Sequence, residues 1–195
     1  MGNTRIASDT QLLAGNLGQL PEPMAEPRFI MVSGLPGAGK SYFCKKLVER
    51  LPFLILESDA LRETLFSPPT YSLAERSRLF RSLHHLIEGL LKQRIPLVLD
   101  ATNLSERYRK RLYNIADRLN VKLIVVRIEA PPNLVYKRLK ARTEERKPKV
   151  NSDADWAVYQ KMMPNMQKIH RNHYAMDTSR DITPVLDKIV MAVNK

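Results

Sequence analysis

The sequence contains one cysteine and no apolar run that approaches the roughly 18 residues of a membrane-spanning helix. A lone thiol at Cys44 can form neither an internal disulfide nor a cysteine-based metal cage, which favours a reducing, cytoplasmic setting. The first residues also lack the apolar core of a secretory signal. We therefore expect a cytoplasmic protein without a membrane partner.

Acidic residues are scarce relative to basic ones. The chain has 20 Asp and Glu against 32 Lys and Arg, which gives a formal net charge of +12. A balance this basic favours polyanionic partners, either nucleic acid or a ligand that carries several phosphates. The alternative is a solvated basic surface without a specific partner. Charge alone does not choose between them.

The chain divides into a proline-rich leader and one domain. Residues 1–27 end in a stretch with three prolines, which is typical of an extended linker, so we expect a flexible leader. In residues 28–195, short apolar runs alternate with longer helical patterns. The expected strands are 29–32, 53–56, 96–99, 121–128 and 174–176, and the expected helices include 39–50, 72–93, 105–119, 132–146, one that opens at Ser152 and is interrupted by Pro164, and 184–193. This order predicts an α/β domain, a five-stranded parallel sheet with helices on both faces.

One stretch matches the motif G-x-x-x-x-G-K-[ST] in full, which is the signature of a phosphate-binding loop. It follows the apolar run 29–32 and opens the helical pattern 39–50, the context that this loop requires. Glycines let backbone N–H groups turn toward phosphate oxygens, and the helix N-terminus behind them favours an anion. We therefore expect ATP to bind at Gly34, Leu35, Pro36, Gly37, Ala38, Gly39, Lys40 and Ser41.

Two side chains are candidates for holding Mg²⁺ beside the triphosphate. In such loops the lysine, here Lys40, reaches the β- and γ-phosphates, and the hydroxyl of Ser41 is offered to the metal. Asp100 ends the apolar run 96–99, where a metal-organising acid usually stands. The alternative for Asp100 is a residue that caps the next loop.

A second polar segment, residues 58–62, follows the expected strand 53–56. The carboxyl ends of parallel strands meet at one edge of the sheet, so this segment should lie near the phosphate-binding loop. Asp59 could accept the proton of an acceptor hydroxyl, and Arg62 could hold an acidic part of the acceptor. Asp59 could instead only cap the helix that contains Arg62.

Basic residues are concentrated in two helical patterns. Arg138 and Arg142 are four positions apart and share a face of the expected helix 132–146. A basic helix at this place suits a lid whose arginines offset charge on the transferring group, although a solvated helix face is the ordinary alternative. The run 107–111, Arg-Tyr-Arg-Lys-Arg, could follow a phosphate backbone.

Over residues 28–195 the chain resembles the polynucleotide kinase and zeta-toxin-like group of P-loop kinases. The resemblance rests on the order of the phosphate-binding loop, segment 58–62, segment 100–104 and the basic helix. It implies a P-loop NTPase fold and places segment 177–180 near the adenine. Two features depart from the group: no phosphatase domain accompanies the kinase pattern, and Asp100 stands one position earlier than the acid of some polynucleotide kinases.

The resemblance also implies roles for single residues. Asp59 would be the general base, and Arg62 would bind a phosphate of the acceptor. Arg138 and Arg142 would be lid arginines that contact ATP.

These features predict transfer of the ATP γ-phosphate to a hydroxyl, and three hypotheses remain open. The leading one is a kinase for the 5′-hydroxyl of DNA or RNA, which the basic charge favours. The second is a small-molecule kinase that acts on a sugar, an antibiotic or a nucleotide-sugar. The third is a non-catalytic ATP-binding switch in which Asp59 is only structural.

Overall fold

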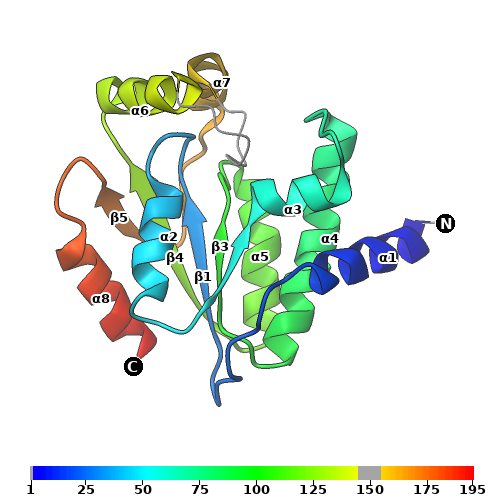
Figure 1. Ribbon diagram of the computed structural model, residues 1–195. Coiled ribbons are helices and arrows are strands. Elements are labelled where there is room, and N and C mark those ends of the chain that lie inside the picture. Colours follow the sequence, from blue (N-terminus) through cyan, green and yellow to red (C-terminus); the bar gives the residue numbers. More distant parts are fainter. Residues whose placement is uncertain (1, 145–154) are drawn as a thin grey trace.

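The chain forms a five-stranded parallel sheet with helices on both faces, as the computed structural model describes it for residues 2–144 and 155–195 (Figure 1). The strands are β1 (Arg28–Ser33), β2 (Leu54–Glu57), β3 (Leu97–Asp100), β4 (Lys122–Glu129) and β5 (Tyr174–Asp177). Their order in the sheet is β2-β3-β1-β4-β5, and every neighbouring pair is parallel. The predicted fold class is confirmed, with each expected strand within about one residue of its place.

The two faces of the sheet are covered by different helices. The helices are α1 (Gly2–Gly15), α2 (Lys40–Val48), α3 (Ser58–Leu65), α4 (Leu73–Lys92), α5 (Glu106–Arg118), α6 (Pro132–Glu144), α7 (Trp156–Met162) with a 3₁₀ turn (Met163–Asn165), and α8 (Thr183–Val193). Strand side chains alternate between faces, so Phe29 and Met31 pack toward α1, α3, α4 and α5. Ile30 and Val32 pack toward α2 and α8. Burial on both faces explains why these strands read as continuous apolar runs.

The first segment differs from the expected flexible leader. Residues 2–15 form α1, which packs against α4 and α3. Leu13 is fully buried in the core on that face of the sheet, and Asp9 accepts two hydrogen bonds of 2.6 Å from Arg78 of α4. The expectation of a loose leader is wrong for residues 2–15, because the prolines that suggested it lie at 21–27, after the helix has ended.

Two of the expected helix boundaries cannot be compared with the described helices. The end expected for α6 at Arg146, and the start expected for the next helix at Ser152, both lie outside the described residues. Within them, α7 is capped by Asp155, whose carboxylate accepts a hydrogen bond of 2.9 Å from the N–H of Val158. As expected, the helix ends before Pro164, which lies in the 3₁₀ turn.

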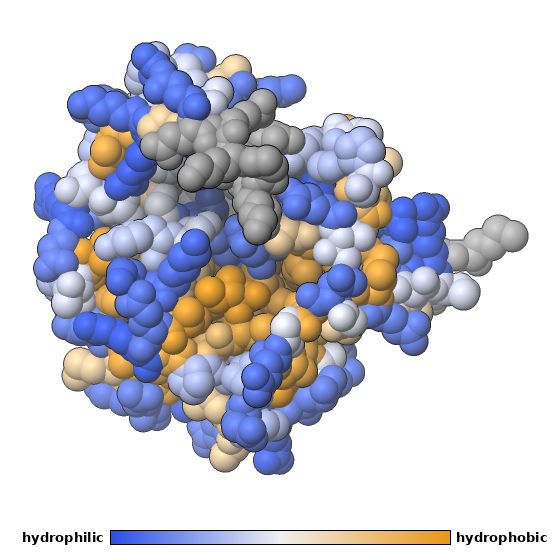
Figure 2. All heavy atoms as spheres, viewed as in Figure 1, coloured by the Kyte–Doolittle hydropathy of each residue, from blue (hydrophilic) through white to orange (hydrophobic). Residues whose placement is uncertain are grey.

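The visible face of the molecule is hydrophilic over most of its rim, while hydrophobic residues gather across its middle (Figure 2). β2 is an edge strand of the sheet, and its residues Leu54 and Ile55 are only partly buried.

In the part of the chain that the structure describes, no helix combines the length and the apolar character that crossing a membrane requires.

Candidate active site

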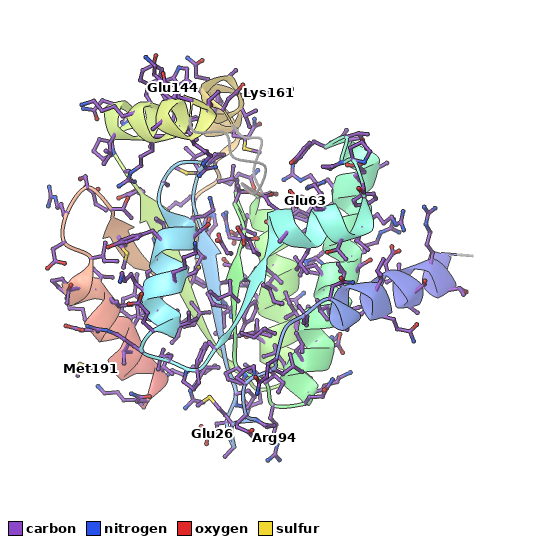
Figure 3. The ribbon with its side chains drawn as sticks, in the orientation of Figure 1. Glu26, Glu63, Arg94, Glu144, Lys161 and Met191 are labelled. Carbon is purple, nitrogen blue, oxygen red and sulfur yellow. The ribbon has the colours of Figure 1, made fainter. Side chains whose placement is uncertain are left out.

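The polar segments predicted from the sequence meet at one end of the sheet. Segments 34–41, 58–62 and 100–104 follow β1, β2 and β3, and these three strands are neighbours in the sheet. In Figure 3, Glu63 of α3 lies toward the same end of the molecule as Glu144 of α6, and Arg94 lies at the opposite end. The candidate site therefore lies at the carboxyl ends of the strands, where open α/β sheets bind ligands.

The phosphate-binding loop needs its glycines for conformation and for packing. Gly37 and Gly39 have φ angles of 75° and 98°, in the left-handed region that strains other residues. A Cβ on Gly34 would lie 2.4 Å from the carbonyl oxygen of Ile128 in β4. A Cβ on Gly37 would lie 2.9 Å from Val135 of α6. The loop is thus held tightly between the sheet and α6.

The N-terminus of α2 faces this loop without a capping side chain. Its N-cap residue is Gly39, and no side chain accepts a hydrogen bond there. The first N–H groups of a helix have no acceptor within the helix, and the helix dipole adds partial positive charge at this end. The end of α2 therefore has the properties of a phosphate-binding site.

Lys40 and Ser41 begin α2 and reach different partners. Lys40 Nζ donates a hydrogen bond of 3.1 Å to the carbonyl oxygen of Leu35. Burial lowers the pKa of Lys40, and the carboxylates of Asp100 and Asp59 oppose that shift. Ser41 Oγ donates a hydrogen bond of 2.6 Å to Asp100 Oδ2, which joins the end of β3 to the loop and brings the two candidate metal ligands together.

The oxygen atoms beside Ser41 fit a magnesium ion. Hydroxyl and carboxylate oxygens such as those of Ser41 and Asp100 are ligands that Mg²⁺ prefers. Glu57 is in register with Asp100, and the pKa of Glu57 is raised by burial and then by Asp100 and Asp59. A cation would relieve this repulsion. Among the described residues, no group of three or more His, Cys, Asp and Glu side chains could hold a metal ion.

Helix α6 is tied to the loop through Arg138 and Thr178. Arg138 donates hydrogen bonds to Thr178 Oγ1 (2.8 Å), to the carbonyl oxygen of Thr178 (3.0 Å) and to that of Gly37 (3.3 Å). Thr178 Oγ1 donates in turn to the carbonyl oxygen of Ala38 (2.7 Å). Arg138 therefore lies against the phosphate-binding loop, and α6 and α7 cover that end of the sheet (Figure 1).

A cavity of about 830 Å³ opens on the loop and the basic helix, within the usual range for ligand pockets. It extends along the segment between β5 and α8, where Thr178, Arg180 and Ile182 contribute. The predicted residues that line it are Gly37, Gly39, Lys40, Ser41, Arg138 and Arg142. The predicted residues Gly34, Leu35, Pro36 and Ala38 belong to the loop but do not line the cavity.

Asp59 and Arg62 lie on α3, outside this cavity. Asp59 is in the first turn of α3, close enough to Lys40 to affect its pKa. Arg62 is only 8% exposed, and its Nε and Nη1 atoms have no hydrogen-bond acceptor among the described residues. Its Nη1 lies 3.8 Å from Glu75 Oε2, and its guanidinium lies 4.9 Å from the centre of the Tyr71 ring. A buried N–H group without a hydrogen-bond acceptor lowers the stability of the fold. Binding of an anion by Arg62 would remove this cost.

The run 107–111 does not form one basic strip. Arg109 is fully buried and donates hydrogen bonds to the carbonyl oxygens of Asn103, Leu104, Gln167 and Lys168, at 2.6 to 2.9 Å. It fixes the turn between β3 and α5 to the segment before β5. The prediction that the whole run follows a phosphate backbone is therefore wrong for Arg109, because α5 turns this side chain inward.

Sequence reasoning missed Glu57 as a residue of the site. It also missed that Thr178 anchors α6 to the phosphate-binding loop. Glu57 ends β2 one residue before segment 58–62, and this position at a strand end was the available signal. Thr178 had no signal of its own, since its importance comes from contacts with α6 and with the loop. The catalytic roles given to the sequence-predicted residues stay predictions.

A family model described as "AAA domain" matches residues 29–169 of the chain. The L-seryl-tRNA(Sec) kinase of Methanococcus maripaludis is 31% identical over 114 residues, which are 56% of this chain and 44% of that protein. The chain thus spans less than half the length of this curated relative.

Several solved structures share the fold at low identity. The Mycobacterium tuberculosis APS kinase CysC, in complex with AMPPNP and APS, has a TM-score of 0.65 and 17% identity, covering 89% of this chain and 100% of that chain. Kti12 of Chaetomium thermophilum, in complex with ADP-AlF3, has a TM-score of 0.67 and 16% identity, covering 83% and 96%. A chain of the Pnkp1/Rnl/Hen1 RNA repair complex has a TM-score of 0.61 and 19% identity, covering 78% and 46%.

Proposed function

Because the chain belongs to the AAA-domain family whose model matches residues 29–169, we propose that it is a kinase that transfers the γ-phosphate of ATP to a hydroxyl group. The observation that carries this proposal is the convergence of Lys40, Ser41 and Arg138 on one nucleotide-sized cavity, with Asp100 bound to Ser41 behind it. Asp59 stands beside this group on α3, where an acceptor can approach.

The loop and its neighbours bind the triphosphate. Lys40 leaves the carbonyl oxygen of Leu35 and donates to the β- and γ-phosphates, which compensates its burial. Ser41 and Asp100 would hold Mg²⁺, which would offset negative charge on the phosphate oxygens. Arg138 and Arg142 add positive charge from α6 and help to exclude water from the cavity.

The transfer step uses residues of α3. Asp59 accepts the proton of the acceptor hydroxyl as its oxygen forms a bond to the γ-phosphorus. The bond between that phosphorus and the bridging oxygen breaks, and ADP leaves with the electron pair. Arg62 binds an anionic group of the substrate that receives the phosphate. The oxygen atoms of that group accept hydrogen bonds from the buried N–H groups of Arg62.

For the acceptor we favour a hydroxyl on a polynucleotide, with the 5′-hydroxyl of DNA or RNA first. The net charge of +12 and the buried Arg62 favour a phosphate-bearing acceptor. The second candidate is a hydroxyl carried by an aminoacylated tRNA, which the 31% identity to an L-seryl-tRNA(Sec) kinase favours. A small-molecule acceptor is the remaining alternative in the same fold.

The test is transfer from γ-labelled ATP to a panel of acceptors. The panel contains 5′-hydroxyl DNA and RNA oligonucleotides, seryl-tRNA, sugars and nucleotide-sugars. We expect label in a nucleic acid, loss of label with Lys40→Ala, and unchanged labelling with Lys161→Ala, an exposed lysine of α7 outside the cavity. Labelling of a sugar alone would refute the polynucleotide proposal, and no labelled acceptor at all would refute the kinase.

A further inference from the structure

We propose that basic residues on α4 and α5, half-buried at Arg76 of α4 and exposed on α5, form a second contact surface, which binds the phosphodiester backbone of a nucleic-acid strand whose reacting end lies at Asp59 and Arg62. We call Arg76, Arg107, Lys110 and Arg111 the α4–α5 basic face. The proposal rests on the proposed function in one respect, because it makes the acceptor a polynucleotide.

Three cations of this face share one side of α5. Arg107, Lys110 and Arg111 stand at helix positions i, i+3 and i+4, and all three are exposed. None of them forms an ion pair with a carboxylate of residues 2–144 or 155–195. They are the exposed basic residues of the run 107–111, in which Arg109 is buried.

The carboxylates of the same helix are already neutralised elsewhere. Glu106 lies 2.7 Å from Arg109, and Asp117 lies 2.5 Å from Arg171. The first pair lies within α5 and the second joins α5 to the segment before β5, so neither carboxylate offsets the charge of Arg107, Lys110 and Arg111. A surface whose acids are paired internally attracts a polyanion more strongly than a surface of alternating charges.

Aromatic rings hold two of the guanidinium groups in place. The guanidinium carbon of Arg76 lies 5.1 Å from the centre of the Tyr108 ring, and that of Arg111 lies 6.0 Å from it. Phe80 of α4 stacks on Tyr108 at 5.1 Å, which joins the two helices. A guanidinium that lies over a ring still has N–H groups at its edge to donate to phosphate oxygens. The arginines are thus ordered before a ligand arrives.

The α4–α5 basic face is continuous with the acceptor side of the candidate site. Arg76 follows Glu75 in α4, and Glu75 Oε2 lies 3.8 Å from Arg62 Nη1. Glu75 also accepts hydrogen bonds from the N–H groups of Thr70 and Tyr71, so it is fixed in this position. Arg62 therefore meets α4 through Glu75, one residue before Arg76, and Arg76 and Arg111 in turn contact the same Tyr108 ring. A small acceptor would reach only Arg62, whereas a strand with a phosphate at every nucleotide would meet the whole series.

The test measures binding of single-stranded 20-nucleotide RNA and DNA by fluorescence anisotropy at several salt concentrations. The variant replaces Arg107, Lys110 and Arg111 together by Gln. The matched control, which removes the same charge, replaces Arg94, Lys188 and Lys195 by Gln; all three are exposed, and Arg94 lies at the opposite end of the molecule from Glu63 (Figure 3). Melting temperatures confirm that both variants fold.

We expect the α5 variant to raise the Kd for the strand at least about tenfold, and to reduce the slope of log K against log salt by about 2. The control should change Kd less than about twofold. An equal loss in both variants, no loss in the α5 variant, no binding by the wild type, or equal competition by polyglutamate would overturn the proposal. The readout is binding, so it stands whether or not phosphate transfer is detected. Stronger binding of RNA than DNA, or the reverse, then identifies the kind of strand.

Discussion

At the scale of single residues, the sequence predicted the phosphate-binding loop because its chemistry is local. Gly37, Gly39, Lys40 and Ser41 must be adjacent to make a turn that opens a helix, so their spacing is visible in the chain. The pairing of Ser41 with Asp100 was also predictable, since strand ends of a parallel sheet meet.

Thr178 was not predictable as an anchor, because its role arises only when three distant segments pack together. Replacing it by Val removes one hydroxyl while keeping the shape of the side chain. We expect Thr178→Val to lower the free energy of unfolding by about 1–3 kcal/mol, because Arg138 and the carbonyl oxygen of Ala38 lose a buried partner. The Kd for ATP should rise several-fold. Denaturant unfolding and nucleotide titration measure both, with Thr4→Val, at an exposed threonine of α1 outside the cavity, as the control.

His84 predicts a pH dependence of stability. Burial, with smaller contributions from Arg111 and His85, lowers the pKa of His84 to about 4, and its Nε2 atom has no hydrogen-bond partner among the described residues. In the unfolded chain this histidine has a pKa near 6.5. Between pH 6.5 and pH 4 it is therefore protonated in the unfolded chain but mostly neutral in the folded chain. Stability is therefore full above pH 6.5, and this histidine removes about 2–3 kcal/mol of it by pH 4.5.

Urea unfolding at pH 7 and pH 4.5 tests this prediction. His84→Leu should lose less stability than the wild type on acidification. His85→Leu, at the exposed neighbour, should behave as the wild type does. An unchanged pH dependence in His84→Leu would show that other groups are responsible.

At the scale of helices, periodicity explains what could be predicted in α5. Arg109 shares the face of Leu112, Tyr113 and Ala116, which are all buried, so the signal that it turns inward was present in the 3.6-residue repeat. The run 107–111 was interpreted by its composition and not by its faces. A basic run on a helix therefore has to be divided by face before it is assigned to a partner.

The buried arginine and its exposed neighbour make a matched pair. Arg109→Ala should destabilise the fold by about 3–5 kcal/mol, because it leaves Glu106 and several carbonyl oxygens without their donor. Arg107→Ala should change stability by less than about 0.5 kcal/mol. Equal effects of the two changes in thermal unfolding would contradict the inward position of Arg109.

Helix α1, unlike α5, has no clear pattern in its sequence that predicts a helix. Its apolar residues are few and widely spaced, and the prolines that follow it suggested a linker. The helix depends on tertiary contacts, since Leu13 enters the core and Asp9 binds Arg78. These partners lie about 70 positions away along the chain, where no local pattern reveals them.

At the scale of the whole molecule, the sequence predicted parallel strands and two helical layers, but not the strand order. That order, β2-β3-β1-β4-β5, brings the ends of β1, β2 and β3 together and so places Asp59 and Asp100 near Lys40. The family match to residues 29–169 agrees with this arrangement. We therefore propose above all that a nucleotide bound at the loop gives its γ-phosphate to an acceptor beside α3.

The most direct test combines transfer and binding in the variant Asp59→Asn. Label from γ-labelled ATP is followed into 5′-hydroxyl oligonucleotides and seryl-tRNA, and the Kd for ATP is measured on the same samples. We predict that transfer falls by about 10²- to 10⁴-fold while ATP binding stays within about twofold of the wild type. Transfer at the wild-type rate by Asp59→Asn, or a wild type that binds ATP and labels no acceptor, would contradict the claim.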